Sequence, residues 1–341
     1  MACPCRADTM NEPMLCVPAA SCGRNDSVHP DFQDKPAQVA ILLCTYQGER
    51  FLSEQIDSFL SQTYGSWKVW ASDDGSTDGT LGILDAYREK LGHERLAVVH
   101  GPGRGFVANF LSLACRDDVQ ADFYAYADQD DIWLNDKLER AIKWLTSLPR
   151  AVPALYCSRT LFVDEENREI GMSALFSKPP AFSNALVQSI GGGNTMVFNA
   201  AARALLCQAG ADVPAVSHDW WTYMVVAGCG GEVLYDAVPS LRYRQHGDNL
   251  VGMNTGVGAR FERWRLLWDG RFRRWNEANL IALRRLQERL TPENRKIMDG
   301  FSHARTLPRL PGLVALWHSG VHRQSWVDSL GLFVAFFFKK M

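Results

Sequence analysis

The sequence predicts an α/β fold in which a mostly parallel, Rossmann-like sheet is flanked by helices. Short apolar runs, of the kind that form buried parallel strands, alternate with segments whose apolar residues recur at helical spacing. The links between these segments are short and polar, as they are in repeated strand–helix units. We therefore expect a doubly wound sheet followed by a helical C-terminal region.

The expected elements follow one another from residue 39 onward. In the first part of the chain, strands are expected at 39–43, 67–71, 96–99, 123–127 and 154–157. Helices are expected between them at 51–60, 81–87, 106–113 and 137–142. Further along, the pattern predicts a strand at 196–198, a helix from Asn199, a helix at 222–227 and a strand at 233–235.

Composition divides the 341 residues into three segments. Residues 1–37 are rich in Pro, Cys, Asn, Asp and Ser without periodicity, which predicts a disordered extension. Residues 38–255 hold the predicted sheet. In residues 256–341, aromatic and basic side chains alternate between Phe261 and Trp275. Such a helix either lies on an anionic membrane surface or packs on the sheet domain with its basic face in solvent, and the sequence favours neither.

Charge and cysteine content exclude some classes of protein. The net charge of -2 argues against nucleic acid as a partner. Four of the nine cysteines fall in the first 22 residues without the paired spacing of a zinc site, and the other five have the apolar neighbours of buried thiols. No signal peptide is recognisable, and the apolar run Leu330–Phe338 is too short to span a bilayer. We expect a cytoplasmic protein.

Three aspartates crowd the end of the expected strand at 123–127: Asp128, Asp130 and Asp131. Carboxylates this close repel one another at low dielectric, so their placement suggests that they hold a cation. A hard divalent ion, Mg2+ or Mn2+, suits oxygen ligands. The alternative is an acidic loop that only caps the next helix.

Polar residues also follow three other strands. Thr45 and Tyr46 end the first, Asp73 and Asp74 the second, and Arg104 follows the third. In doubly wound sheets, ligands bind outside the carboxyl ends of the strands. Four strand ends that carry polar chemistry therefore favour a ligand crevice over the capping alternative.

Three later motifs carry less specific signals. The triplet Gly191–Gly193 before Asn194 either allows close approach of the backbone to a ligand or forms a plain turn, and it lacks the GK[ST] ending of a phosphate loop. Asp219 stands at the start of an apolar helix, where it is either functional or an N-cap. Turn residues follow His246, which favours a site or surface role over a core histidine.

These motifs resemble those of family 2 glycosyltransferases of the GT-A fold and, in detail, bacterial rhamnosyltransferases of polysaccharide assembly. The resemblance extends over residues 38–255 in the family's order. The matching segments are Ile41–Gly48, Ser72–Asp78, Asp128–Trp133, His218–Trp221 and Tyr243–Gly247.

The resemblance implies an inverting hexosyltransferase with Asp219 as its base and with Mg2+ or Mn2+ held by Asp130 and His246. The residues implied in binding the nucleotide sugar are Thr45, Tyr46, Glu49, Asp73, Asp74, Arg104, Asn109, Asp128 and Gln129. Those implied in acceptor binding or positioning are Asp131, Trp133, Gly193, Asn194, His218 and Trp220. The QxxRW pattern of processive members is absent, which implies addition of a single sugar.

The implied reaction moves a sugar to a lipid-linked saccharide acceptor in surface polysaccharide assembly. The first candidate for the donor is dTDP-L-rhamnose, which supplies L-rhamnose. Another nucleotide sugar is the alternative donor. Because a divalent ion neutralises the leaving diphosphate, only one carboxylate is needed to take the acceptor's proton, whereas glycoside hydrolysis usually needs two. The protein is expected in the cytoplasm, as a peripheral protein on the inner face of the cell membrane.

Two other classes of protein compete with this interpretation. A sugar nucleotidyltransferase would need a basic, glycine-rich loop after the first strand, but Gly48 is followed there by the acidic Glu49. A non-catalytic carbohydrate- or nucleotide-binding module has no need for both the acidic cluster and Asp219. The sequence therefore favours a transferase.

Overall fold

The computed structural model describes residues 36–246 and 270–341. The predicted disordered extension, except for its last two residues, lies outside the described residues. So does the part of the predicted basic, aromatic helix between Phe261 and residue 269.

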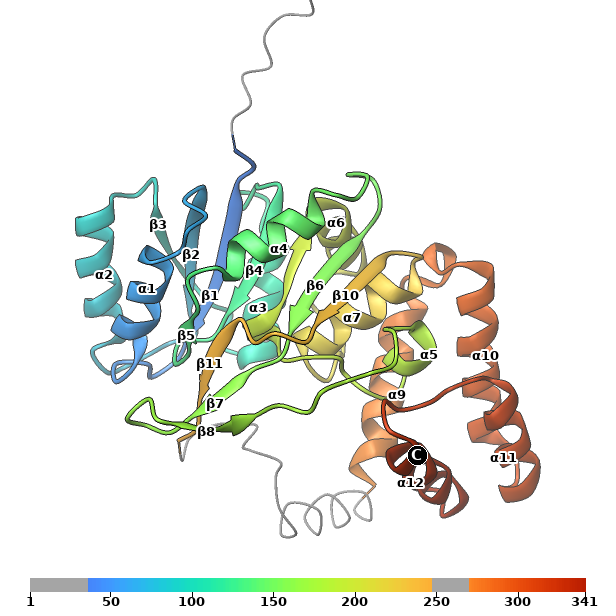
Figure 1. Cartoon of the computed structure of the whole chain (residues 1–341). Helices are drawn as coiled ribbons and strands as arrows, with labels where there is room; N and C mark the ends of the chain where they lie inside the picture. Colours follow the sequence, from blue (N-terminus) through green and yellow to red (C-terminus); the bar gives the residue numbers. More distant parts are fainter. Residues whose placement is uncertain (1–35, 247–269) are drawn as a thin grey trace, which may run out of the picture. The chain divides into compact units, whose positions relative to one another are not determined.

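A seven-stranded sheet forms the centre of the fold (Figure 1), in the order β10-β6-β9-β4-β1-β2-β3. Its strands are β1 (Val39–Thr45), β2 (Trp67–Asp73), β3 (Leu96–His100), β4 (Phe123–Ala127), β6 (Ala154–Ser158), β9 (Val197–Asn199) and β10 (Glu232–Asp236). Neighbouring strands run parallel, except that β9 is antiparallel to both β4 and β6. The predicted α/β fold with a mostly parallel sheet is therefore confirmed.

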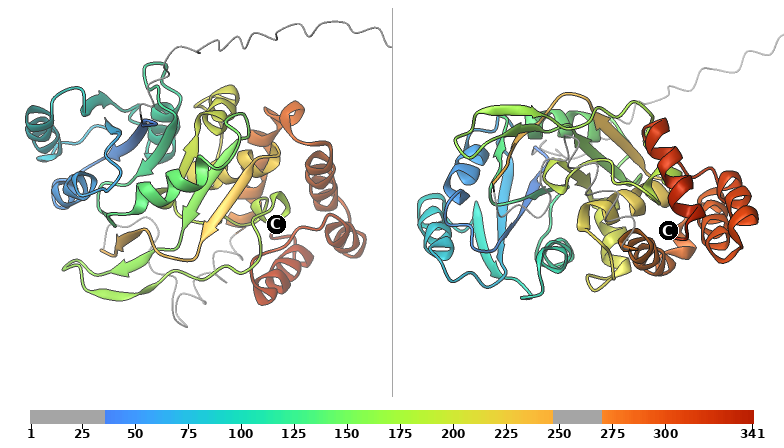
Figure 2. Two further views of the ribbon diagram at one scale, coloured as in Figure 1. Left: turned by 45° about the horizontal axis from the view of Figure 1, so that its top comes forward. Right: turned by 90° about the horizontal axis from the view of Figure 1, so that it is seen from below.

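Helices pack on both faces of this sheet (Figure 2). They are α1 (Leu52–Leu60), α2 (Thr80–Leu91), α3 (Phe106–Ala114), α4 (Lys137–Leu145), α5 (Phe182–Ala185), α6 (Ala200–Ala209) and α7 (His218–Gly228). All seven residues of β1 are buried, and alternate side chains enter opposite cores. Ile41 and Leu43 pack in the core that includes α1 and α4, and Leu42 packs in the core that includes α3, α6 and α7.

A second sheet of four short strands was not predicted. Its order is β5-β11-β7-β8, with β5 (Ile132–Trp133), β11 (Leu241–Arg244), β7 (Leu161–Val163) and β8 (Glu169–Met172). Strand β11 pairs antiparallel with β5, so Arg242 lies opposite Ile132. This pairing brings the chain after β11 to the acidic loop after β4, although more than a hundred residues separate them.

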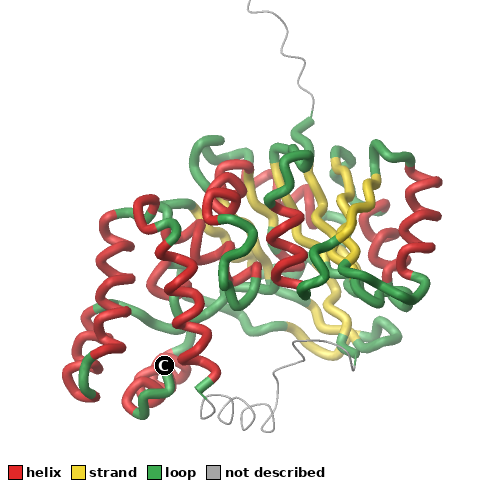
Figure 3. The backbone as a smooth tube through the Cα atoms, turned by 180° about the vertical axis from the view of Figure 1, so that it is seen from behind, coloured by secondary structure: helices red, strands yellow, loops and turns green. Residues whose placement is uncertain are grey.

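The C-terminal region is helical, as predicted, and its helices gather at one end of the sheet (Figure 3). They are α9 (Arg271–Arg284), the short η2 (Gln287–Arg289), α10 (Pro292–Thr306), α11 (Arg309–His318) and α12 (Trp326–Phe337). Leu283 of α9 and Phe301 of α10 are fully buried in the same core as Trp221 of α7. The apolar run predicted at residues 330–338 forms most of α12.

Within residues 36–246 and 270–341, no helix combines the length and apolar character needed to cross a membrane. The five cysteines in the described residues are free thiols. Cys44 and Cys157 are buried as expected, whereas Cys115, Cys207 and Cys229 are partly exposed.

Candidate active site

The ends of β1 and β2 are joined by a buried hydrogen bond. Thr45 Oγ1 donates to Asp73 Oδ1 at 2.9 Å, and both side chains are at most 3% exposed. The carboxylate of Asp73 also accepts hydrogen bonds from Ser76 Oγ at 2.6 Å and from the backbone N–H groups of Ser76 at 2.8 Å and Gly75 at 3.1 Å. Asp73 therefore shapes the turn after β2, and its contacts favour a supporting role beneath the predicted nucleotide pocket.

Asp74 connects the loops that follow β2 and β3. Its Oδ1 accepts from the Gly103 N–H at 2.7 Å, and its Oδ2 accepts from the Gly105 N–H at 2.8 Å. Arg104 lies between these two glycines and is exposed. Asn109 is buried below the loop. Its Oδ1 accepts from Ser72 Oγ at 2.5 Å, and its Nδ2 donates to the Ser72 carbonyl at 2.9 Å. This geometry leaves Arg104 accessible to a ligand and makes Asn109 a support.

The loop after β1 is held against the acidic loop after β4. The side-chain amide of Gln129 accepts from the Tyr46 N–H at 2.8 Å and donates to the Tyr46 carbonyl at 2.9 Å. Tyr46 itself is 59% exposed. Glu49 accepts from the Gly79 N–H at 2.9 Å, next to the start of α2. Gln129 and Glu49 thus order the loop that presents Tyr46.

The acidic cluster interacts with residues from two distant segments. Burial raises the pKa of Asp128 to about 7, with further contributions from the negative charges of Asp130 and then Asp219. Asp219 therefore lies close enough to Asp128 for their charges to interact. Asp130 Oδ2 is 2.8 Å from Nε2 of His246, just beyond β11. The fold thus gathers the predicted base, the predicted metal ligands and the acidic loop.

Asp131, the third aspartate of the cluster, and Lys137 are both completely buried. Asp131 Oδ2 accepts from Asn194 Nδ2 at 2.7 Å, and Lys137 Nζ donates to the Asn194 carbonyl. Burial raises the pKa of Asp131 well above its usual range and lowers the pKa of Lys137 well below its own. Lys137 also lies over the buried ring of Trp133, 3.6 Å from its centroid.

Sequence reasoning missed Lys137, although a signal was present. Lys137 occupies the same helical face as Leu138, Ala141, Ile142 and Leu145, all of which are buried in α4. A lysine in phase with an apolar stripe points to a buried cation and hence to a buried partner.

His218 and Asp219 occupy the first two positions of α7. The imidazole of His218 stacks on Phe110 at 3.9 Å and meets Tyr126 edge-on at 4.7 Å. Neither ring nitrogen has a hydrogen-bond partner among the described residues. Burial lowers the pKa of His218 to about 4, so the ring is neutral at neutral pH. A β-carbon on Gly193 would lie 2.2 Å from Nε2, which shows how closely the glycine segment approaches.

Trp220 and Trp133, predicted to bind the acceptor or position the site, are both buried. Trp220 is 6% exposed, donates from Nε1 to the Ala185 carbonyl at 2.6 Å and packs edge-on against Trp275. Trp133 is 2% exposed and packs against Phe59. These contacts favour positioning over direct contact with an acceptor.

Neither the acidic cluster nor Asp219 holds the N-cap position of the helix that follows it. The N-cap of α4 is Asp136, beyond the acidic cluster, and the N-cap of α7 is Ser217, two residues before Asp219. The carboxylate of Asp219 accepts only from the adjacent Trp220 N–H, at 2.7 Å, within the described residues.

The donor set fits a divalent ion that shares its coordination with a ligand. In the described part of the chain, no three His, Cys, Asp or Glu side chains are placed to hold a metal by themselves. Asp130 Oδ2 and His246 Nε2 lie 2.8 Å apart, so a carboxylate and an imidazole, both of which bind divalent ions, meet at one point from distant segments. Mg2+ commonly binds one or two protein ligands together with substrate phosphates. Asp130 and His246 fit this arrangement.

Comparison with known proteins shows which family the central part of the chain matches. Residues 40–205 match the model of the family described as "Glycosyl transferase family 2". The chain is 28% identical to "dTDP-rhamnosyl transferase RfbG" of Shigella flexneri over 246 residues, which cover 68% of this chain and 81% of that protein. It is 32% identical over 111 residues to the Escherichia coli glucosyltransferase WfgD, covering 31% of this chain and 40% of the relative.

Among solved structures, a mannosyltransferase from Pyrobaculum calidifontis is similar at 18% identity and a TM-score of 0.48, over 90% of this chain and 86% of that one. TarS of S. aureus, residues 1–349, is similar at 15% identity and a TM-score of 0.46, over 82% and 81%. The fold of the present chain is α/β, with a mixed sheet flanked by helices. Residues 40–205, which include most strands of the central sheet, therefore form a glycosyltransferase family 2 domain, and the protein is an enzyme that transfers sugars.

Proposed function

We propose that this glycosyltransferase inverts the configuration of the sugar it transfers, with Asp219 as the base. The observation that carries the proposal is the proximity of Asp219, at the start of α7, to Asp128, at the end of β4. One acidic group from each side of a crevice suits a reaction in which the donor is held on one side and the acceptor hydroxyl is deprotonated on the other.

The donor's nucleotide would lie over the ends of β1, β2 and β3. There Tyr46 presents an exposed ring that can stack on a base, and Asp74 holds the 103–105 backbone around the accessible Arg104. The buried pair Thr45 and Asp73 supports this surface from below. The diphosphate would then extend toward Asp128 and Asp130.

Asp130 and His246 would hold Mg2+ or Mn2+, which supplies the positive charge that stabilises the departing diphosphate. The chain's own residues prepare the other half of the reaction. Asp219 keeps one carboxylate oxygen on the Trp220 N–H, so its other oxygen is left to accept the hydroxyl proton of the acceptor. The buried, neutral His218 beside it packs against Phe110 and Gly193 and helps to position the start of α7 without adding charge.

We further propose L-rhamnose from dTDP-L-rhamnose as the donor and a lipid-linked saccharide of surface polysaccharide assembly as the acceptor. The name and coverage of the Shigella relative support the donor. The name of the E. coli relative, a glucosyltransferase acting on a diphosphoundecaprenol-linked sugar, supports the acceptor class. Free thiols throughout the described residues support a reducing compartment, the cytoplasm. Addition of a single sugar, as the sequence implied, is part of the proposal.

The test is a thermal-shift measurement with dTDP, UDP and GDP, each with Mn2+ or with EDTA, followed by product analysis with dTDP-L-rhamnose. A nucleotide at about 100 times its dissociation constant should stabilise the protein by about 2.7 kcal/mol. We expect dTDP to give this shift with Mn2+ and a much smaller one with EDTA. A preference for UDP or GDP would replace the proposed donor, and equal activity in EDTA would exclude the metal.

A further inference from the structure

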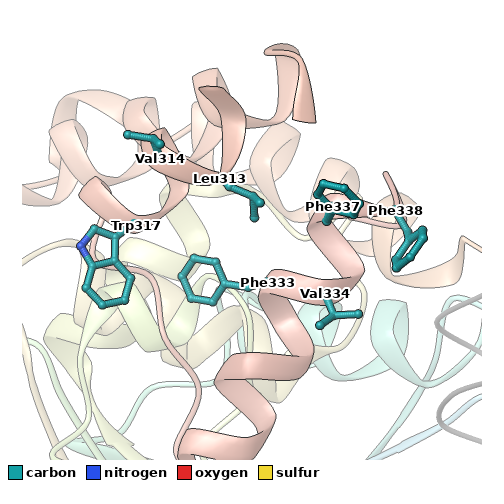
Figure 4. A pocket seen from close by; sticks show the side chains of 7 residues that line it. All are labelled: Leu313, Val314, Trp317, Phe333, Val334, Phe337 and Phe338. Carbon is teal, nitrogen blue, oxygen red and sulfur yellow. The ribbon is translucent and has the colours of Figure 1, made fainter. Parts of the chain in front are cut away.

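Helices α11 and α12 enclose an open apolar groove that the proposed reaction does not use. The groove has a volume of about 490 Å³ and is lined only by apolar side chains (Figure 4). Leu313, Val314 and Trp317 line it from α11, and Phe333, Val334 and Phe337 line it from α12. The rings of Trp317 and Phe333 are tilted by 46° to each other, with centroids 6.0 Å apart.

The apolar surface continues beyond the groove along both helices. Trp317 is 72% exposed and Trp326 is 75% exposed, and Leu310, Val314 and Leu330 are each more than half exposed. On α11 the exposed residues recur at positions 310, 314 and 317, and on α12 at positions 326 and 330 ahead of the groove residues. Each helix thus carries an apolar stripe that faces solvent. We call this surface, from Leu310 to Phe338, the C-terminal apolar face.

Charge identifies the kind of partner that this face fits. Residues 301–341 contain five Lys and Arg but only one acidic residue, Asp328, although the whole chain carries a net charge of -2. Arg309 lies over Phe337 at the edge of the groove, 5.7 Å from the ring centroid, and Lys339 lies 5.7 Å from the ring of Phe336. Asp328 is tied to Ser325 at the start of α12. Apolar stripes with tryptophans and a basic rim are typical of helices that lie in the interface of an anionic bilayer.

The face is firmly connected to the helix that carries Asp219. The segment before α12 is bonded to the α5 region, where Gln324 N–H donates to Gln188 Oε1 at 2.8 Å and Asn184 Nδ2 donates to the His322 carbonyl at 3.1 Å. From α5, the Ala185 carbonyl accepts from Trp220 Nε1 at 2.6 Å. A surface bound to α11 and α12 would therefore hold α7 in a defined orientation.

We propose that the C-terminal apolar face is an in-plane docking surface for an anionic phospholipid bilayer. No described helix can span a bilayer, so the helices would insert side chains into the interface while the basic rim contacts lipid headgroups. The inference rests on the proposed function in one respect, because a lipid-linked acceptor gives this docking its purpose.

The test is flotation of the full chain with phosphatidylcholine vesicles that contain about 30% phosphatidylglycerol or none. We expect the protein to bind the anionic vesicles and to bind the neutral vesicles at least about tenfold more weakly. Binding to the anionic vesicles should also weaken in about 0.5 M salt. The double variant Trp317→Ser with Trp326→Ser should lose at least about tenfold in partition. Ile281→Ser, a matched control on α9 at a residue 52% exposed, should bind as the parent does. Arg309→Gln should reduce the preference for anionic lipid.

Circular dichroism and the dTDP thermal shift establish that the variants are folded and that their donor site is unchanged. Partition that is unaltered in the double variant would overturn the proposal. A second result would also overturn it: the parent forms a dimer in solution and does not bind vesicles, and the double variant is monomeric. The face would then be covered by a second copy of the chain. If vesicles bind but no nucleotide does, the proposed function fails and the docking surface stands.

Discussion

At the scale of single residues, the two carboxylate oxygens of Asp219 have different roles in the proposed reaction. One oxygen accepts from the Trp220 N–H, and this contact fixes the direction of the other. We predict that Asp219→Asn lowers kcat by at least about a hundredfold, the usual scale for loss of a general base, and leaves donor binding intact. Initial rates of product formation and the dTDP thermal shift would measure both effects.

Asp212→Asn is the matched control for that substitution. Asp212 lies seven residues earlier, is exposed and pairs with Arg285 at 2.6 Å. Its loss should change kcat less than about twofold, because exposed ion pairs contribute little. A rate for Asp219→Asn as high as that of the control would remove Asp219 from the role of base.

His218 makes stability depend on pH. Burial lowers its pKa to about 4 in the folded state, against about 6.5 in the unfolded chain. As pH falls from about 6.5 to 4, the unfolded chain takes up a proton that the folded protein does not. The free energy of unfolding should therefore fall across this window, by up to about 3 kcal/mol.

Urea denaturation at pH 7 and pH 4.5 tests this prediction through a pair of variants. His218→Gln should show a smaller loss of stability between the two pH values than the parent. His93→Gln, at an exposed histidine, should keep the parent's dependence. The same slope in all three proteins would contradict the role of His218.

At the scale of elements, the approach of the short helix η1 (Gly193–Thr195) to α7 depends on a missing side chain. A β-carbon at Gly193 would lie 2.2 Å from His218 Nε2. We predict that Gly193→Ala pushes the two elements apart, destabilises the protein by about 1–3 kcal/mol and lowers kcat through displacement of His218 and Asp219. Denaturant melts and initial rates would report the two effects.

Gly82→Ala serves as the control for that prediction. Gly82 lies within α2, and a β-carbon there would meet no atom within 4 Å. This substitution should stabilise the protein by about 0.5–1 kcal/mol, because alanine loses less backbone entropy in a helix. Equal behaviour of the two alanine variants would show that η1 and α7 have room to separate freely.

At the scale of the whole molecule, the catalytic sheet and the C-terminal helices share one core. Leu283 and Phe301 are fully buried in the cluster that also holds Trp221 and Val225 of α7. The proposed boundary at residue 255 therefore separates regions of different composition that are packed together.

We predict that a chain ending at residue 255 does not fold cooperatively, because the face of α7 that packs on α9 and α10 would be exposed to water. Its thermal melt should lack the parent's sharp transition, and dTDP should give no shift. A soluble fragment that binds dTDP would instead show that the sheet domain is independent of the helices.

Local patterns account for most of the central fold. The strand from Val39 and the helical stripe from Phe51 lie within one residue of their predicted starts, because continuous apolar runs and helical periodicity are properties of neighbouring residues. The strands β5, β7 and β8 escaped prediction. They are only two to four residues long, and β8 is exposed along its length, so their stability depends on pairing with distant segments.

Some features of the site could likewise be predicted from local sequence, and others could not. The sequence alone indicated which strand ends carry polar chemistry, because parallel strands in such a sheet present their carboxyl ends on one side. Only the tertiary structure could pair Asp130 with His246 at 2.8 Å, seat Lys137 beneath Asp131 and expose the stripes of α11 and α12. Those features come from contacts between residues far apart in the chain and from which faces remain uncovered, and no local pattern encodes either. The sequence by itself therefore determined the α/β class and most of the polar residues of the crevice. The tertiary structure decided which of them line it, which support it from below, and which surface of the molecule remains open to a partner.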